Sequence, residues 1–465
     1  MNHRLPAFIL SFILFPLLLC AQWDDKDQLS TAFHQQRRAA LRELLPPKSC
    51  AVFFANPVRN RSNDVDFQYS QNPNFYYLTG YTEPNALILI FKEPRNIDGN
   101  QVNEILFVQE RNAKEEIWTG QRLGVDGAKK LLGINAVYNG KDFNEFGIDF
   151  SKFEKIFVGF PEFPNQEKND NADLADLVNQ FRFKTAQQSA AVDSSRLQRF
   201  MAELREVKQA EELILIQKAI DISIAGFTEM IKIIKPGMTE YQAQAIVEFY
   251  MKKYGSEYQG YGSIAGGGKN SCVLHYTFNR KELVATDMLL ADMGAEYHGY
   301  TADITRTVPV DGNFSTEERA IYQLVLDAQN AGFNACRPGN IFSATQIAAK
   351  EVIAKGLMKL GIITKPEDVT IYFMHGTSHY LGLDVHDAGT YGSLKPGTII
   401  TVEPGIYIPS GSACDPKWWN IGVRIEDDVL ITEEGFKVLS IALPREIDAL
   451  ELLMKQTGEL EPVFK

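Results

Sequence analysis

Short apolar runs mark the first third of the chain. Ala51–Ala55, Leu87–Phe91 and Ile105–Gln109 are brief and rich in β-branched or aromatic residues, which is typical of buried strands. Phe75–Leu78 has the same character and predicts a further strand, beyond a polar loop at Asn60–Asp66. This region is therefore expected to form a domain built around a sheet.

The pattern becomes helical near residue 200. Residues 161–175 are polar and contain proline, which predicts a surface loop. Beyond them, apolar residues recur at every third position from Met201 and continue through Ile214–Ile220, as in one amphipathic helix. Single cores stop growing at about 250–300 residues, so a chain of 465 residues is expected to form two domains. We place these domains at residues 24–195 and 196–465.

Two similar blocks follow in the second domain. A helix is expected after Thr239 as far as Lys253, followed by strands over 283–310. Two further helices are expected at about 316–335 and 342–360, followed by strands from about 371 to 441. Each half thus has helices and then strands, which favours an α+β fold with an internal duplication.

The first residues have the layout of an export signal. One positive charge in Met1–Arg4 precedes an apolar stretch, Ala7–Leu19, which is shorter than the roughly 20 residues that a membrane-spanning helix needs. Cys20–Gln22 then offers small residues for cleavage, so residues 1–21 are expected to be a signal peptide and the mature protein to be periplasmic or secreted. Two alternatives stay open: lipidation of Cys20, which would anchor the protein, and a buried N-terminal helix.

Composition narrows the class of protein. With 45% hydrophobic and 23% charged residues, the chain matches folded globular proteins and not disordered ones. The 59 acidic and 47 basic residues give a net charge of −12, which argues against a nucleic-acid partner because phosphate binding needs a basic face. Five cysteines are too few for a disulfide scaffold and lack zinc-binding spacing. We expect no transmembrane span.

Two aspartates stand in apolar surroundings that do not suit an isolated charge. Asp292 follows the apolar stretch Val284–Ala291, and Asp303 lies in a second apolar segment. The intervening Gly294–Gly299 predicts a hairpin turn that would bring both carboxylates together on adjacent antiparallel strands. An ionised carboxylate in such a strand costs on the order of several kcal/mol unless it is paired or bound to a metal. Pairing with Arg306, or capping of a turn, is the alternative.

The second half of this domain adds two glutamates and a histidine cluster. Glu403 ends an apolar run, and Glu426 shares a strand face with Arg424. His379 lies in a segment of twelve residues that holds three of the seven histidines of the chain. Four carboxylates and an imidazole suit a hard divalent ion such as Mn²⁺ better than a thiolate zinc site, and two ions would balance the negative charge. Such a pair of ions predicts a hydrolase.

These segments resemble the creatinase/methionine-aminopeptidase superfamily, and within it the Xaa-Pro aminopeptidases (aminopeptidase P) of peptidase family M24. The likeness covers residues 200–445 and rests on these ordered motifs: Tyr261–Gly266, His275–Thr277, Asp292–Thr307, His375–Asp387, Thr401–Tyr407 and Val423–Asp428. A weaker likeness covers Asn60–Asp64 and Gln71–Tyr81. The resemblance implies an α+β, pita-bread catalytic domain that follows a creatinase-like α/β domain, in a homo-oligomer (dimer or tetramer).

The resemblance also implies a role for each chemical group of the site. The five metal ligands would be Asp292, Asp303, His379, Glu403 and Glu426. Glu403 would in addition act as the base for the bridging water. His275 and His386 would hold the scissile carbonyl and stabilise the oxyanion, as preorganised donors do.

Other residues would support or bind the substrate. His375 would line the pocket on the proline side, and Arg424 with Tyr407 would orient Asp292 by hydrogen bonds. Tyr261 and Asp64 match positions near the amino end of the substrate, although a residue of the N-terminal domain could serve a neighbouring subunit instead.

Purely structural roles for Arg424 and Tyr407 stay open at this point. Arg424 could pair with Asp427 or Asp428, and Tyr407 could be a core residue.

The predicted activity is removal of the N-terminal residue from peptides with proline at the second position. Two divalent ions, foremost Mn²⁺ with Co²⁺ or Zn²⁺ as alternatives, would be the cofactors. A prolidase that cleaves Xaa-Pro dipeptides is the nearest rival, because it would use the same ligands. A peptide-binding module on a catalytically dead fold is a rival from another class.

Overall fold

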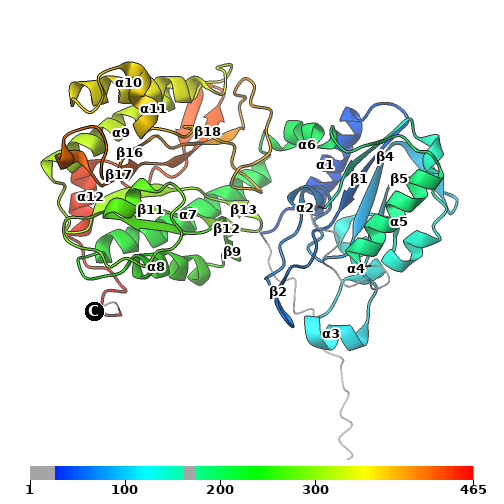
Figure 1. The fold of residues 1–465 in the computed structure, drawn as a ribbon. Helices are drawn as coiled ribbons and strands as arrows, with labels where there is room; N and C mark the ends of the chain where they lie inside the picture. Colours follow the sequence, from blue (N-terminus) through cyan, green and yellow to red (C-terminus); the bar gives the residue numbers. More distant parts are fainter. Residues whose placement is uncertain (1–26, 162–172, 464–465) are drawn as a thin grey trace, which may run out of the picture.

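The computed structural model describes residues 27–161 and 173–463, which form two domains (Figure 1). The predicted signal peptide and Cys20 lie outside the described residues, as does most of the predicted loop at 161–175. In the described ranges no helix combines the length and hydrophobicity that crossing a bilayer would need.

The N-terminal domain is built on a six-stranded sheet. In spatial order its strands are β6 (Val137–Asn139), β5 (Asn100–Val108), β4 (Leu87–Ile97), β1 (Ser49–Phe54), β7 (Lys155–Gly159) and β8 (Val192–Asp193). The central strand β1 is buried throughout and apolar from Cys50 onward, because successive side chains point to opposite faces and both faces are covered. Ala51 and Phe53 share a core with helix α1 (Thr31–Leu44), and Val52 shares one with α5 (Leu174–Gln187).

The sequence prediction for this domain was right for three strands and wrong for one. β1, β4 and β5 confirm the strands expected at 51–55, 87–91 and 105–109, but Phe75–Leu78 belongs to helix α2 (Pro73–Thr79). The Asn72 side chain accepts a hydrogen bond from the N–H of Phe75, and Gly80 ends the helix with a left-handed φ of 71°. A short apolar run is compatible with a buried helix as well as with a strand. Here the capping residues Asn72 and Gly80 favour the helix.

The polar segment at 60–66 is a small exposed hairpin and not a plain loop. Its strands are β2 (Asn60–Ser62) and β3 (Val65–Asp66), and Asp64 lies in the turn between them. The remaining helices of the domain are α3 (Ala113–Thr119) and α4 (Gly124–Leu132).

The helix expected from Met201 to Ile220 is divided in two. Helix α6 (Leu197–Arg205) packs against α1, and four residues separate its end from the start of α7 (Ala210–Ile233). Gln209 causes the break, since its N–H donates to the Glu212 carboxylate at 2.8 Å in a capping box. The predicted domain boundary near 195 lies between β8 and α6.

The second domain places strands between two helix pairs (Figure 1). One pair is α7 with α8 (Glu240–Lys253), and the other is α9 (Thr316–Ala335) with α10 (Ala344–Lys359). Two three-stranded sheets carry the core: β10 (Ile264–Gly267), β11 (Met288–Asp292) and β14 (Thr305–Pro309), and then β15 (Ile399–Val402), β18 (Asp427–Thr432) and β19 (Gly435–Val438). The order of helix pair and then strands thus occurs twice, as the sequence predicted.

Smaller elements complete the second domain. They are strands β16 (Gly405–Ile408), β17 (Ile421–Arg424), β9 (Tyr258–Gln259), β12 (Ala295–Tyr297) and β13 (Tyr300–Thr301), and helices α11 (Val369–Tyr372) and α12 (Ile447–Met454).

The segment between the two aspartates contains more secondary structure than the single turn that the sequence predicted. β11 and β14 are adjacent and antiparallel, as expected, with Asp292 opposite Thr305. The predicted turn segment Gly294–Gly299 does not join β11 to β14 directly, because it belongs to a second hairpin, β12–β13, which turns at His298 and Gly299. Both of these residues have positive φ (49° and 84°), which is the usual requirement of a two-residue hairpin turn.

Candidate active site

The five predicted metal ligands reach one cavity from five segments of the second domain. Asp292 ends β11, Asp303 precedes β14, and His379 lies in the loop before β15. Glu403 follows β15, and Glu426 lies between β17 and β18. All five line a cavity of about 540 Å³. The structure therefore brings together residues that are up to 134 positions apart.

Backbone pairing sets these positions. The N–H of Glu426 donates to the Thr305 carbonyl at 3.1 Å, so Glu426 lies beside β14, and Thr305 in turn is opposite Asp292 on β11. On the other side, the N–H of Glu403 donates to the carbonyl of Thr377 at 2.8 Å, which places the His379 segment along β15. The predicted ligands are thus held by strand registers and not by loops alone.

The side-chain distances fit a metal centre. The Nε2 atom of His379 lies 3.3 Å from Asp303 Oδ2 and 3.5 Å from Glu403 Oε1. One ligand atom each from Asp303, His379 and Glu426 lie within 4.8 Å of one another. Tyr261 is close as well, since its hydroxyl lies 2.6 Å from a carboxylate oxygen of both Asp292 and Asp303.

The charges of this cavity are unbalanced without cations. Burial raises the pKa of Glu403 to about 7, and it raises the pKa values of Glu426 and Asp292, with the neighbouring carboxylates adding to each shift. Carboxylates that resist ionisation because they are buried beside one another are stabilised in the charged form by a divalent ion. The donor set of oxygens and one imidazole nitrogen therefore fits two hard divalent ions.

The Nε2 atom of His379 faces the carboxylates and is free to bind a metal ion. Its Nδ1 lies 3.0 Å from the carbonyl oxygen of Tyr380, so a proton on Nδ1 leaves the lone pair of Nε2 facing the carboxylates. Burial opposes a charge on this ring, but Asp303 and Glu403 outweigh burial and raise the pKa of His379 to about 9. The pKa of His379 is thus raised by the same excess of negative charge that a bound metal ion would neutralise.

Arg424 forms the network that the resemblance implied. Its guanidinium donates to Asp292 Oδ2 at 2.5 Å and to the Tyr407 hydroxyl at 2.9 Å, and that hydroxyl lies 2.8 Å from Nε2 of His375. Tyr407 is fully buried, yet its hydroxyl belongs to the site, so the alternative of a plain core residue is wrong. The hydrogen bonds through Arg424, Tyr407 and His375 thus connect the predicted ligand Asp292 to the wall of the cavity.

The alternative partners proposed for Arg424 and for the two aspartates are also wrong. Asp427 pairs with Arg306 at 2.8 Å, and Asp428 accepts a hydrogen bond from the N–H of Asp303 at 3.1 Å. Arg306 therefore pairs with neither Asp292 nor Asp303. Its role is to fix the strand that follows Glu426, because it also donates to the Glu426 carbonyl at 2.7 Å.

Sequence reasoning missed Thr305. Its hydroxyl donates to Glu426 Oε2 at 2.7 Å and accepts from Nε of Arg424 at 3.2 Å, so it orients a predicted ligand. The sequence did offer a signal, the polar run Thr305–Thr307 within a predicted strand. In the structure this run is fully buried, and a buried hydroxyl needs a hydrogen-bond partner.

The three other histidines of the predicted site lie around the same cavity. His275, His375 and His386 all line it, and the His386 ring lies 4.2 Å from that of His379. Burial and the nearby Arg424 lower the pKa of His375 to about 4, so this ring is neutral near pH 7. Neutral imidazoles beside the carboxylate cluster can donate a hydrogen bond to a substrate carbonyl.

The prediction for Asp64 is not met within one chain. Asp64 is exposed at the tip of the β2–β3 hairpin and is not among the residues that line the cavity. A role of Asp64 at the substrate-binding site of a neighbouring subunit stays a prediction. Tyr261, in contrast, lies directly on the carboxylates.

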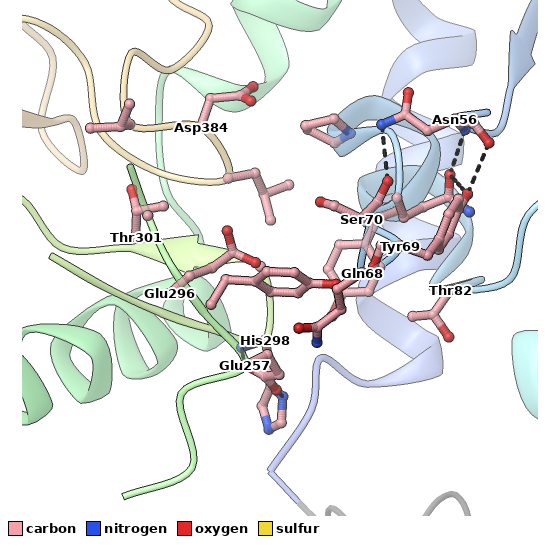
Figure 2. Close-up of a pocket in the computed structure, with 18 of the residues that line it drawn as sticks. Asn56, Gln68, Tyr69, Ser70, Thr82, Glu257, Glu296, His298, Thr301 and Asp384 are labelled. Atoms are coloured by element: carbon pink, nitrogen blue, oxygen red, sulfur yellow. Dashed lines mark hydrogen bonds and ion pairs between the residues drawn. The ribbon is translucent and has the colours of Figure 1, made fainter. Parts of the chain in front are cut away.

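A second cavity of about 660 Å³ lies between the two domains (Figure 2). Figure 2 shows Asn56 and Ser70 on the N-terminal side, and Glu296 and Asp384 on the other. Val385 and His386 line both cavities, so the two are neighbours across one short segment.

Comparison with known proteins agrees with this architecture. Residues 214–433 match the sequence model of metallopeptidase family M24, and residues 34–155 match that of the aminopeptidase P N-terminal domain. The chain belongs to metallopeptidase family M24, and its catalytic domain has the pita-bread α+β fold. Within this family it is similar over nearly its whole length to Xaa-Pro aminopeptidases.

The relatives cover both domains. An Xaa-Pro aminopeptidase of Escherichia coli K12 is 34% identical over 440 residues, which are 92% of this chain and 98% of the relative. That of Haemophilus influenzae is 35% identical over 433 residues, 90% and 96% respectively. Among solved structures, an aminopeptidase of Pseudomonas aeruginosa superposes with a TM-score of 0.83, and E. coli aminopeptidase P with the inhibitor Pro-Leu with 0.82. Both are 33% identical and cover 92% of this chain and 98% of theirs.

Replacing Arg424 by methionine tests its link to Asp292. The substitution keeps much of the side-chain length but removes the donors to Asp292 and Tyr407, so we expect kcat/KM to fall about 10- to 100-fold. The measurement is steady-state hydrolysis of a proline-containing tripeptide with saturating Mn²⁺. The control is Arg319→Met, which breaks a surface ion pair with Glu451 and should leave kcat/KM unchanged. Unchanged kcat/KM for Arg424→Met would show that Asp292 does not depend on this guanidinium.

Proposed function

We propose that this protein removes the N-terminal residue from peptides that carry proline at the second position. The observation that carries the proposal is the convergence of four carboxylates and one imidazole on a single cavity, beside histidines that can hold a carbonyl. The full-length similarity to Xaa-Pro aminopeptidases supports it.

Asp292, Asp303, His379, Glu403 and Glu426 would hold two divalent ions. When bound, such ions lower the pKa of water and polarise a carbonyl group. Glu403 would take the proton of the attacking water on its free carboxylate oxygen. His275 and His386 would donate hydrogen bonds to the carbonyl oxygen of the N-terminal residue, where negative charge develops.

Proline at the second position explains the need for a special pocket. The amide before proline lacks an N–H group and has restricted geometry, so peptidases that bind that N–H handle it poorly. In the cavity that holds the predicted metal ligands, Ile264, Leu274 and Val385 provide an apolar wall that suits a pyrrolidine ring.

The charges around the cavities favour an aminopeptidase over a prolidase. A prolidase must bind the free carboxylate that directly follows the proline ring. Among the described residues that line the first cavity, the one basic side chain besides histidine is Arg424, which is committed to Asp292 and Tyr407. The second cavity has no lysine or arginine in its described lining. A peptide that continues beyond proline places its carboxylate elsewhere.

This proposal predicts a dependence on substrate length. For Ala-Pro-Ala and longer peptides we expect kcat/KM at least about 10-fold higher than for the dipeptide Ala-Pro, since the dipeptide buries a carboxylate without a partner. Release of alanine is measured with added Mn²⁺, and Ala-Ala-Ala is the control for the proline requirement. Cleavage confined to the dipeptide would reverse the assignment in favour of a prolidase.

For the metal we propose Mn²⁺, because an oxygen-rich donor set favours it over softer ions. The zinc-substituted form of E. coli aminopeptidase P shows that the fold of that relative also takes zinc. Adding Mn²⁺, Co²⁺ or Zn²⁺ to chelator-treated protein and measuring tripeptide hydrolysis ranks the three ions. The proposal fails if Mn²⁺ restores less activity than Zn²⁺.

We also propose that the protein is exported and forms a homo-oligomer. The signal-like first 21 residues support export, and mass spectrometry of the mature N-terminus tests it, with Cys20 as the terminal residue if the protein is lipidated. The exposed position of Asp64 on a hairpin supports an oligomer in which it reaches a neighbouring subunit. Light scattering, together with the KM of Asp64→Ala, tests this second proposal.

A further inference from the structure

The position of His386 depends on its backbone. Within the described ranges its ring has no hydrogen-bond partner, and the segment Gly382–His386 has no regular secondary structure. A side chain that must donate to a substrate carbonyl needs a fixed direction, because a misplaced donor stabilises little charge. Something outside the ring must therefore fix this segment.

Asp387, the next residue, is fixed from three directions. Its side chain is 2% exposed, and Oδ2 accepts a hydrogen bond from Lys208 Nζ at 2.6 Å. Its Oδ1 accepts from Nη2 of Arg205. Its N–H donates to the carbonyl of Tyr380 at 2.8 Å, which closes the loop that carries His386. The backbone on the C-terminal side of His386 is therefore immobilised.

Arg205 holds the other side of the same loop. Its Nη2 also donates to Asp384 Oδ2 at 2.7 Å, two residues before His386. Its Nη1 donates at 2.8 Å to the side-chain oxygen of Asn74, which lies in helix α2 of the N-terminal domain. One buried guanidinium thus contacts the His386 loop twice and the opposite domain once.

The loop leaves room for this arrangement. A Cβ atom at Gly382 would lie 2.2 Å from Asp387 Oδ2 and 2.9 Å from Lys208 Nζ, so a larger residue would displace the ion pairs. Arg205 and Lys208 outweigh the effect of burial and lower the pKa of Asp387, which is therefore charged. Buried charges of this kind depend on every partner being present.

We propose that Asp387, held by Arg205 and Lys208, is the positioning residue for His386, and that Arg205 extends this hold to the N-terminal domain through Asn74. The inference rests on the proposed function, in which His386 holds the scissile carbonyl. Asp387 acts through the backbone of His386, which it follows directly.

The test is a double-mutant cycle between Asp387 and His386. For Asp387→Asn we expect kcat to fall about 10- to 100-fold, while KM stays within about 3-fold and bound metal is unchanged. In a His386→Ala background the same substitution should lower kcat by less than about 2-fold, because its target is already absent. A merely structural role would lower kcat equally in both backgrounds.

Glu104→Gln is the matched control. Glu104 also accepts hydrogen bonds from two cations, Arg38 at 3.0 Å and Arg42 at 2.7 Å, but it lies in the N-terminal sheet. This variant should lose stability and keep kcat. If Asp387→Asn does not fold, Lys208→Met replaces it in the same cycle, since Arg205 still balances the carboxylate in that variant.

Two failures can be told apart. A wild-type protein that cleaves no Xaa-Pro peptide refutes the proposed function. An active wild type in which Asp387→Asn and Lys208→Met keep full kcat, or lose it equally with and without His386, refutes the positioning role alone.

Discussion

Replacing Glu403 by glutamine is expected to lower kcat by about 10²- to 10⁴-fold. The substitution keeps the shape of the side chain but removes both the negative charge that would face the ions and the oxygen that would accept the proton of the attacking water. The Glu403 carboxylate faces two imidazoles, since His379 Nε2 and His375 Nδ1 each lie 3.5 Å from one of its oxygens, and the substitution alters both contacts. Single-turnover hydrolysis of Ala-Pro-Ala at fixed Mn²⁺ measures the loss.

Glu83→Gln serves as the control for this substitution. Burial also raises the pKa of Glu83, but this glutamate lies in the N-terminal domain and lines neither cavity. It should retain full kcat. A Glu403→Gln variant with more than about a tenth of the wild-type kcat would contradict the role of Glu403 as base.

Removal of the metal is expected to make stability depend strongly on pH. The pKa of Glu403 in the folded, metal-free protein is about 7, above its ordinary value of 4.5. Below about pH 4.5 the group is protonated in both the folded and the unfolded state and costs nothing. As pH rises from 4.5 to 7 the unfolded chain loses this proton first, so the free energy of unfolding falls, and above pH 7 the penalty is constant. Glu426 and Asp292 shift in the same direction.

Bound ions should cancel this penalty. At a free metal concentration of about 1,000 times Kd, binding to the folded state alone adds about 4 kcal/mol per site. We therefore expect chelator-treated protein to have a Tm that falls between pH 5 and pH 8, and metal-loaded protein to have a higher Tm whose difference from the metal-free form grows over that range. Differential scanning calorimetry at both pH values measures it. A metal-free Tm that rises with pH would contradict the crowding of carboxylates.

The sequence was most informative where chemistry and secondary structure are local. Asp292 and Glu403 each end an apolar run, and both occupy strand ends at the cavity. The helices after Thr239 and at 316–335 were predicted correctly, because capping residues and apolar periodicity depend only on residues close together in the sequence. The same local patterns singled out the five candidate metal ligands, and the resemblance added a role for each of them.

The failures have a common physical cause. Phe75–Leu78 forms a helix, and the helix expected from Met201 is broken at Gln209, because capping side chains decide between conformations of similar apolar content. Thr305 and Asp387 were missed as supporting residues because their partners, Glu426 and Lys208, are 121 and 179 positions away. Asp64 lies outside the cavity because the placement of a hairpin tip depends on packing between domains and subunits.

The central claim is that five side chains from five segments hold two ions, and counting bound metal tests it most directly. After equilibrium dialysis against Mn²⁺, mass spectrometry should find two ions per wild-type chain, and at most one in Glu426→Ala with activity lost in parallel. Two ions retained in Glu426→Ala with unchanged turnover, or no metal bound by the active wild type, would contradict the account.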